Sequence, residues 1–227
     1  MPFIEDMNIE IKNITKSFGK KEVLSGIDIS AQSGMCIGII GKNGSGKSTL
    51  FSVLTGIAKK EKGDFLCDGE SLFENSEKRR ELVGFVPQTP PLMEELNSLD
   101  NLKLWYKKDD LKKELERGVL KMLGIDGFLK TTVNKLSGGM KKRLSIGCAI
   151  AHKPKILILD EPSASLDIEG KETVSQFLSA FKNQGGIVLL ATHDVAEFEI
   201  CDKLYLLRNG KAESFLYDSK NPTEIFR

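Results

Sequence analysis

The sequence predicts an α/β fold with a mainly parallel sheet covered by helices on both faces. Three short, continuously apolar runs indicate buried strands: "MCIGII" at 35–40, "ILIL" at 156–159 and "IVLLAT" at 187–192. Strands of this kind are buried on both faces of a sheet. Helical patterns lie between these runs, and such alternation is typical of parallel sheets. The 227 residues suffice for one large domain with an inserted subdomain.

The elements before residue 89 follow from local patterns. Residues 9–14 and 23–29 alternate loosely in polarity and flank "SFGKK", which predicts an antiparallel β segment at the start of the chain. The apolar run at 35–40 leads into "GKNGSGKST", and "LFSVLTGI" behind it predicts a helix. "GDFLCDGE" predicts a short strand pair, and "ELVGFVPQ" predicts a strand that stops at Pro87.

The segment 89–135 differs from the rest, because it contains two helical patterns and no strand-like run. Leucine, valine and methionine side chains recur there at spacings of three and four and predict one buried helix face. These residues are Leu111, Leu115, Val119 and Met122. With the helix expected after Gly139, the segment predicts a helical subdomain inserted into an α/β core.

After the insert the α/β alternation resumes. An apolar helix stripe precedes the strand at 187–192, and "CDKLYLLRNGKAESFLY" predicts a hairpin that turns at Asn209-Gly210. The stripe consists of Val174, Phe177, Leu178 and Phe181. We therefore expect a single domain, in which residues 1–88 and about 152–227 form the core and about 89–151 form the helical subdomain.

Composition excludes several classes of protein. Lys and Arg number 33 against 32 Asp and Glu, so the net charge of +1 gives no electrostatic reason to bind nucleic acid. No apolar run approaches the about 18 residues of a membrane span. The start, "MPFIEDMNIE", lacks the features of a signal peptide, so we expect a cytoplasmic chain.

The cysteines are scattered and form no CxxC pair, and the chain has only two histidines, so no zinc site is expected. We expect reduced thiols that pack as small apolar side chains. The four are Cys36, Cys67, Cys148 and Cys201.

Residues 41–48 fit the pattern G-x-x-x-x-G-K-[ST] between a predicted strand and a predicted helix, as that motif requires. Its three glycines let the backbone wrap a polyphosphate with N–H groups pointing inward. Lys47 would place its ammonium on the β- and γ-phosphates, and Ser48 would hold Mg²⁺. Thr49 would reach another phosphate oxygen. The pattern predicts a nucleoside triphosphate site.

A carboxylate pair follows the buried strand at 156–159. Asp160 lies at the carboxyl edge of the sheet, where ligands bind in open α/β folds, and it suits the Mg²⁺ shell. Glu161 would orient or deprotonate the water that attacks the γ-phosphate. An Asp-Glu pair by itself is as often a helix cap, but its occurrence with the phosphate loop favours catalysis.

Two further polar residues follow predicted strands at the same edge. Gln88 ends the strand before the helical insert, and its neutral amide would touch Mg²⁺ and the attacking water. His193 follows the strand at 187–192, and its N–H would contact the γ-phosphate. Either residue alone is more often a surface or turn residue. Their matching positions at strand ends favour the functional interpretation.

The stretch "KLSGGMKKRLSIG", residues 135–147, predicts a basic amphipathic helix with two glycines at its start. Each glycine costs up to about 1 kcal/mol relative to alanine, so the pair suggests that something approaches the backbone closely. A helix N-terminus with two lysines nearby suits an anion. Because the loop at 41–48 is the better anion site, this one would serve a phosphate bound to another molecule.

The ordered motifs "GKNGSGKST", Gln88, "LSGGM", "ILILDEP", "SASLD" and "THD" resemble the ATP-binding cassette (ABC) ATPase family over almost the whole chain. The resemblance implies that two cassettes pair head to tail and enclose two ATP molecules with Mg²⁺. Residues 137–139 would then contact the γ-phosphate held by the other subunit, which would explain the glycine pair. The implied ATP contacts are Phe18, Val23, Gly41, Asn43, Gly44, Ser45, Gly46, Lys47, Ser48, Thr49, Ser137, Gly138 and Gly139.

The resemblance also implies individual roles. Lys47, Gln88, Glu161 and His193 would be catalytic, and the segment 163–167 would cross the dimer interface. The implied metal ligands are Ser48, Gln88 and Asp160. Two positions depart from the family pattern. Met140 stands where the commonest signature has Gln, and Phe18 lacks the hydroxyl of the usual Tyr but keeps the ring face that stacks on adenine.

A lone cassette with a short helical insert resembles the ATPase subunit of a membrane transporter. It would lie on the cytoplasmic face of the membrane through separate integral permease subunits. The short insert, the "LSGGMKKRLSIG" string and the lack of a C-terminal regulatory domain resemble small exporters. "TPPLMEELNSLDNLKLWY", with Trp105, would receive a helix of the permease, or would equally fill the core of the subdomain.

The sequence leaves two other functions and one other dimer partner open. A P-loop signalling GTPase would want an Asn-Lys-x-Asp run, and the nearest string, "NKLS" from Asn134, lacks the Asp. A non-transport cassette that acts as a regulatory or mechanical module at the membrane fits the same motifs. The partner cassette could be a paralogue. A homodimer is the simpler expectation, because this chain carries a full set of site residues.

Overall fold

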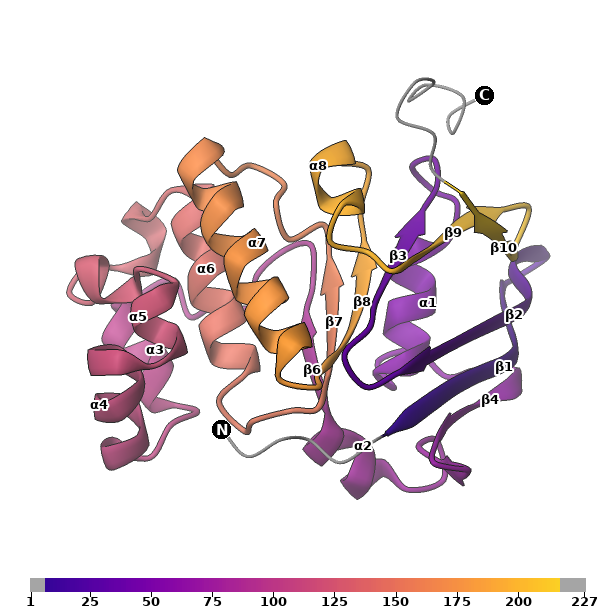
Figure 1. Ribbon diagram of the computed structural model, residues 1–227, viewed down its shortest axis with the longest axis horizontal. Helices are drawn as coiled ribbons and strands as arrows, with labels where there is room; N and C mark the ends of the chain where they lie inside the picture. Colours follow the sequence, from indigo (N-terminus) through magenta and orange to yellow (C-terminus); the bar gives the residue numbers. More distant parts are fainter. Residues whose placement is uncertain (1–6, 217–227) are drawn as a thin grey trace.

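The computed structural model describes residues 7–216. Within them the chain forms two sheets and a set of helices (Figure 1). The larger sheet has the strand order β10-β9-β3-β8-β7-β6, and it is parallel from β9 to β6. The smaller sheet, β2-β1-β4-β5, is antiparallel. This arrangement confirms the predicted α/β class with an antiparallel N-terminal segment.

The strands of the larger sheet are β3 (Cys36–Ile40), β6 (Val83–Val86), β7 (Ile156–Asp160), β8 (Ile187–Ala191), β9 (Lys203–Arg208) and β10 (Lys211–Phe215). Those of the smaller sheet are β1 (Asn8–Phe18), β2 (Lys21–Gln32), β4 (Lys62–Cys67) and β5 (Glu70–Ser71). The helices are α1 (Lys47–Leu54), α2 (Ser76–Leu82), α3 (Ser98–Lys103), α4 (Lys108–Arg117), α5 (Val119–Met122), α6 (Gly138–Ala149), α7 (Ile168–Asn183) and α8 (Val195–Phe198), with 3₁₀ turns at Ile125–Phe128 and Val133–Lys135.

Every residue of β3, β7 and β8 is buried, because the two faces of the parallel sheet are covered by different layers. Successive side chains of a strand point to opposite faces. Ile156 and Ile158 of β7 therefore pack in a core with α1 and the smaller sheet. Leu157 and Leu159 pack in a second core with α6 and α7. The unbroken apolar runs in the sequence reflect this two-sided burial.

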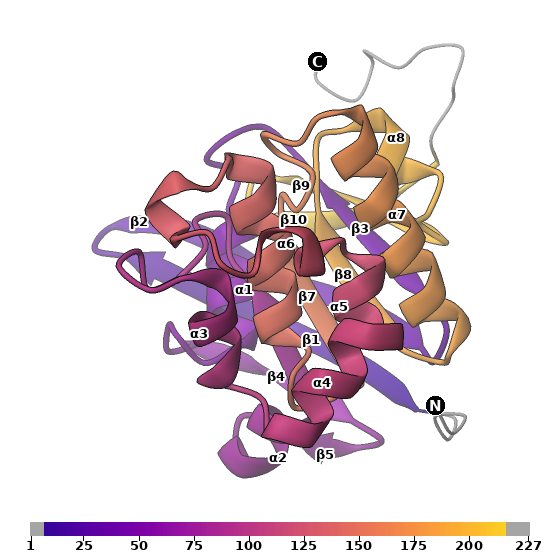
Figure 2. The same ribbon diagram turned by 90° about the vertical axis from the view of Figure 1, so that its left-hand side faces the viewer.

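The segment between β6 and β7 is helical, and Figure 2 shows α3, α4 and α5 on the viewer's side of the sheet. The prediction of one buried helix face from Leu111 to Met122 is only partly correct, since Leu111, Leu115 and Val119 pack against one core but do not lie on one helix with a buried Met122. The helix is interrupted at Gly118, and the N–H of Val119 donates instead to the carboxylate of Glu114 (2.8 Å). Leu111 is buried, whereas the side chain of Met122 is 44% exposed.

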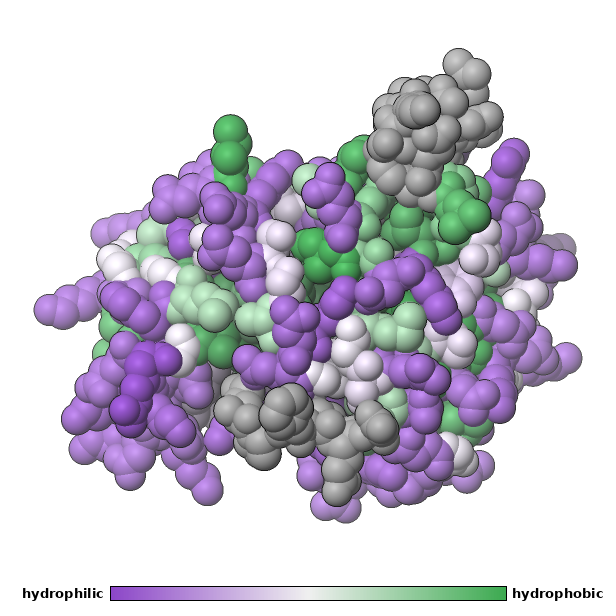
Figure 3. Space-filling model, in the orientation of Figure 1, coloured by the Kyte–Doolittle hydropathy of each residue, from purple (hydrophilic) through white to green (hydrophobic). Residues whose placement is uncertain are grey.

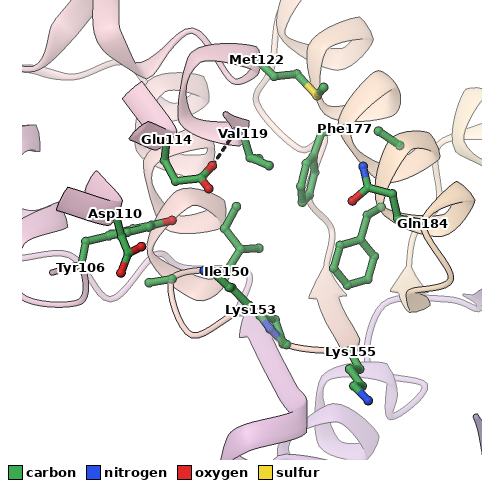
Figure 4. A pocket seen from close by; sticks show the side chains of 14 residues that line it. Tyr106, Asp110, Glu114, Val119, Met122, Ile150, Lys153, Lys155, Phe177 and Gln184 are labelled. Carbon is green, nitrogen blue, oxygen red and sulfur yellow. Dashed lines mark hydrogen bonds between the residues drawn. The ribbon is translucent and has the colours of Figure 1, made fainter. Parts of the chain in front are cut away.

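A cavity of about 240 Å³ lies where this helical segment meets the core (Figure 4). Val119 and Met122 line it from α5, and Phe177 and Phe181 line it from α7. At its edge the Tyr106 hydroxyl donates a hydrogen bond to a backbone carbonyl of α6. This contact fastens the insert to the helix that begins with the two glycines.

The surface is mostly polar on the face shown in Figure 3, and apolar side chains gather between α8 and β9. Beneath that region Ile40, Phe198 and Leu204 form a small third core. Between residues 7 and 216, no helix is both long and apolar enough to cross a bilayer.

We predict that Tyr106→Phe lowers the free energy of unfolding by about 1 kcal/mol, the usual value of one buried hydrogen bond. The hydroxyl is partly buried and lies 2.7 Å from the carbonyl oxygen of Gly147, which would lose its donor. Urea unfolding measures the effect. The matched control is Tyr205→Phe, since no hydrogen bond of the Tyr205 hydroxyl is found in the described chain. Equal losses in both variants would contradict the prediction.

Candidate functional site

The loop from 41 to 49 joins β3 to α1 and has the geometry of a phosphate cradle. Gly46 is the N-cap of α1 and has φ 111°, a backbone angle that residues with a side chain rarely adopt. No side chain caps the helix. The N–H groups in the first turn of α1 are therefore available to bind an anion. Lys47 is buried, and its ammonium donates to the carbonyl of Gly41 (2.9 Å), which holds the charge over the loop.

A cavity of about 390 Å³ lies beside this loop. Val23 lines it together with Asn43, Gly44, Ser45 and the β9–β10 turn. The structure thus brings Val23 to the loop. Phe18 is not among the lining residues. Its ring is 56% exposed at the end of β1, where the ammonium of Lys16 lies 5.2 Å from the ring centroid.

The order of the parallel strands brings four chain segments to one edge of the sheet. β3 ends at the loop, β6 leads to Gln88, β7 ends at Asp160 and β8 leads to His193. Asp160 is 3% exposed and is hydrogen-bonded by the hydroxyl of Ser48. Burial raises the pKa of Asp160, and the Ser48 hydroxyl partly offsets this increase.

Glu161 is the centre of the polar contacts at this edge. One carboxylate oxygen accepts a hydrogen bond from the amide of Gln88 (3.0 Å), and the other lies 3.3 Å from Nδ1 of His193. Its backbone has φ 50°, which is strained for a residue with a side chain. The N–H of Glu161 donates to Ala191 of β8 (2.9 Å) and holds this conformation. Three separately predicted residues therefore meet at one carboxylate.

Residues 137–139 lie at the start of α6. Ser137 is the N-cap, and its hydroxyl accepts a hydrogen bond from the N–H of Met140 (3.2 Å). Ser137 and Gly138 are exposed. Gly139 is buried, and a Cβ there would lie 2.8 Å from a methyl of Leu166. Close packing against residues 163–167 therefore requires one of the two glycines.

The sequence predicts an anion near Lys141 and Lys142 of α6, but in the structure both ammonium groups contact other parts of the chain. Lys141 forms an ion pair with Glu94 (2.9 Å). The buried ammonium of Lys142 donates to the carbonyls of Pro87 (3.1 Å) and Gln88 (2.9 Å), and burial lowers its pKa. Lys142 thus links α6 to the Gln88 segment. The spacing of Gly139, Lys142 and the buried Ile146 was the available signal.

Glu197 is a second residue that sequence reasoning missed. It is buried in α8, and it shares hydrogen bonds with Ser163 and Thr192. Burial raises the pKa of its carboxyl group, and these hydrogen bonds partly counter the increase. It joins the segment after Glu161 to the one before His193. A helix of four residues has no periodicity that could have revealed it.

Comparison with known proteins identifies the family of this chain. The model of the ABC transporter family matches residues 24–164. A lantibiotic transport ATP-binding protein, SrtF of Streptococcus pyogenes, is 31% identical over 96% of this chain and 95% of its own length. A Nod factor export ATP-binding protein I of Sinorhizobium fredii is 33% identical over 91% of this chain and 62% of its own length. Other relatives named for import match at 32–34% identity.

A solved dimer of the ATP-binding cassette MJ0796, in a post-hydrolysis state with ADP and Pi, has a TM-score of 0.80 and 28% identity. The match covers 90% of this chain and 96% of that one. The chain belongs to the ABC transporter family. It is an ATP-binding subunit that hydrolyses ATP, so the signalling GTPase alternative is excluded.

We predict that Asp160→Asn raises the thermal midpoint at neutral pH by about 2–4 °C. A carboxyl group whose folded pKa is raised costs stability above that pKa, and the cost vanishes as the pH falls towards the unfolded value of 3.8. The gain over the wild type should therefore shrink between pH 7 and pH 4. Calorimetry measures it, with the exposed Asp109→Asn as control. A lower midpoint for Asp160→Asn at pH 7 would contradict the prediction.

Proposed function

We propose that the chain dimerises on ATP and drives export of a substrate through separate integral membrane subunits. The observation that carries this proposal is the contact of Glu161 with both Gln88 and His193 at the sheet edge, where the Lys47 loop also ends. A general base, its two positioning groups and a phosphate cradle then act in one place. The transported molecule would be recognised by the membrane subunits.

ATP would be held by its phosphates at the loop. The ammonium of Lys47 and the first N–H groups of α1 would bind phosphate oxygens, with Thr49 reaching a further one. Val23 and the residues 43–45 of the adjoining cavity would face the rest of the nucleotide. Phe18 would stack on adenine through its exposed ring face.

The residues around Asp160 fit Mg²⁺. Ser48 is hydrogen-bonded to Asp160, and the amide of Gln88 is hydrogen-bonded to the adjacent Glu161, so hydroxyl, carboxylate and amide oxygens are present at the same edge of the sheet. These are the hard oxygen ligands that Mg²⁺ takes together with substrate phosphates. When bound, the ion would neutralise charge on the phosphates. Ser48, Gln88 and Asp160 would hold it.

Glu161 would orient the attacking water and accept its proton. The amide of Gln88 and the ring of His193 each contact one oxygen of the carboxylate and so fix its position. His193 is 56% exposed, so its other ring nitrogen is available to the γ-phosphate. Positioning and charge neutralisation would supply most of the acceleration.

The second half of each site would come from another copy of this chain. Ser137 and Gly138 are exposed at the N-terminus of the twelve-residue helix α6, where the N–H groups favour an anion. The Lys142 ammonium connects this helix to Gln88, so each chain would link Gln88 of its own site to the residues that it contributes to the partner's site. The dimeric neighbour with ADP and Pi supports the same assembly.

The start of the helical insert would dock a membrane subunit. Trp105 is 63% exposed and Leu104 is 57% exposed, whereas Leu102 is fully buried. Leu102 therefore fills the core of the insert, and Trp105 does not. With the exposed Met93, these side chains would receive an apolar helix of an integral subunit. This contact would place the chain at the cytoplasmic face of the membrane.

We predict that Glu161→Gln lowers kcat for ATP hydrolysis at least about 100-fold, because the general base is lost while the side chain keeps its shape. ATP then persists, and the variant should shift from monomer to dimer only when ATP is added. Light scattering measures the mass, and Glu116→Gln on α4 is the matched control.

Adding Ser137→Arg to the Glu161→Gln variant should abolish this ATP-dependent dimer, since the bulky cation would occupy the place of the partner's nucleotide. A Glu161→Gln variant that hydrolyses ATP at the wild-type rate would refute the role of Glu161. A variant that binds ATP yet stays monomeric would refute the homodimer.

We predict that Trp105→Ala reduces transport by the complete complex at least about tenfold and leaves ATP hydrolysis by the isolated chain unchanged, because the side chain is exposed and lines neither the cavity beside the phosphate loop nor the one beside Glu161. Substrate accumulation in inside-out vesicles measures both transport and its direction. The exposed Ile57→Ala is the control. Normal assembly and transport by Trp105→Ala would rule out the docking surface. ATP-driven loss of substrate from the vesicle lumen, in place of accumulation, would rule out export.

A further inference from the structure

Two cysteines that lie 165 residues apart in the sequence meet in the folded chain. The sulfurs of Cys36, on β3, and Cys201, after α8, are 3.7 Å apart and share a hydrogen bond. Cys36 is fully buried, while Cys201 is partly exposed. Neither residue belongs to the nucleotide site, and their separation in the sequence gave no sign of the contact.

The fold provides a fitted place for this pair. Gly38 lies on β3, and a Cβ there would come within 2.8 Å of the Cys201 sulfur. The absent side chain therefore leaves the space that the thiol occupies. Cys201 is also fixed by its own backbone, because its sulfur donates to the carbonyl of Glu197 (3.3 Å).

The two backbones are held together from both sides. The N–H of Cys36 donates to the carboxylate of Asp202 (2.7 Å), and the N–H of Asp202 donates to the carbonyl of Cys36 (2.8 Å). The ammonium of Lys182 donates to the other carboxylate oxygen of Asp202 (2.8 Å). These hydrogen bonds keep the two sulfurs close without a covalent bond between them.

We propose that Cys36 and Cys201 form a reversible intramolecular disulfide when the chain meets a peroxide. Cys201 is the less buried residue of the two, so it attacks the peroxide and becomes a sulfenic acid, with release of one water. The Cys36 sulfur then attacks the Cys201 sulfur, and its proton leaves with the hydroxyl as a second water. Overall, hydrogen peroxide is reduced to two waters and the two thiols are oxidised to one disulfide. A dithiol reductant reverses the reaction.

The order of attack follows from the surroundings of each thiol. The hydrogen bond to Cys201 and burial raise the pKa of Cys36, so this thiol stays protonated until its partner is oxidised. The other two cysteines are poorly placed to compete. Cys67 is buried, and burial raises the pKa of Cys148 to about 12.

A disulfide would move the segments that carry the site. The two sulfurs are 3.7 Å apart, and bonded sulfurs lie about 2.05 Å apart, so bond formation pulls on β3 and on the segment after α8. β3 leads directly into the phosphate loop, and α8 follows His193. A displacement of about 1 Å at catalytic groups costs up to about 100-fold in rate. We expect oxidation to lower the rate of ATP hydrolysis several-fold, and this expectation rests on the proposed function.

The test treats the purified full-length chain with a small excess of hydrogen peroxide. We expect a mass loss of 2 Da and one cross-linked tryptic pair, residues 22–42 joined to residues 183–203, both reversed by dithiothreitol. Because the disulfide closes a long loop in the unfolded chain, the thermal midpoint should rise by about 5–10 °C. Cys201→Ser should show neither change, and Cys148→Ser should show both.

Three outcomes would overturn the proposal: an unchanged mass, the addition of oxygen atoms without a cross-link, or a link between two molecules. The peptide map uses the wild-type chain, so the result does not depend on the folding of a variant. The mass is also independent of ATP. A disulfide without loss of ATP hydrolysis would refute only the effect on activity, and an inactive chain that still forms the disulfide would count against the proposed function alone.

Discussion

The parallel hydrogen bonding of β3, β8, β7 and β6 is the constraint on which the site depends. Parallel strands have their carboxyl ends at the same edge, so segments from residues 41, 88, 160 and 193 converge there. Parallel pairing in turn requires helices on both faces, and the two apolar cores on either side of β7 meet that requirement. The chemistry at the edge is therefore inseparable from the burial of the sheet.

At that edge of the sheet several residues adopt conformations or surroundings that are unfavourable in free energy. Glu161 adopts a strained backbone, Asp160 is buried with a raised pKa, and Lys142 is buried with a lowered one. Each is tolerated because a specific partner holds it: a β8 carbonyl, the Ser48 hydroxyl and the carbonyls around Gln88, respectively. Such costs concentrate where charged groups must meet a charged substrate.

The same edge also connects the site to more distant parts of the chain. Lys142 joins Gln88 to the helix that begins at residue 138, and Tyr106 joins that helix to the insert with its exposed Trp105. A movement at the nucleotide would thus reach the surface proposed to meet a membrane subunit. In the same core as α6, the thiols of Cys36 and Cys201 lie beside β3, the strand that leads into the phosphate loop.

The sequence by itself determined the fold class, the phosphate loop and the residues at the strand ends, because these depend on local patterns: apolar runs, glycine spacing and residues adjacent in the chain. Only the tertiary structure decided what depends on contacts between distant segments. It divided the stripe from Leu111 to Met122 at Gly118, left Phe18 outside the cavity lined by Val23, and gave Lys142 its carbonyl partners. It also paired Cys36 with Cys201, since packing, and not spacing, brings those sulfurs together.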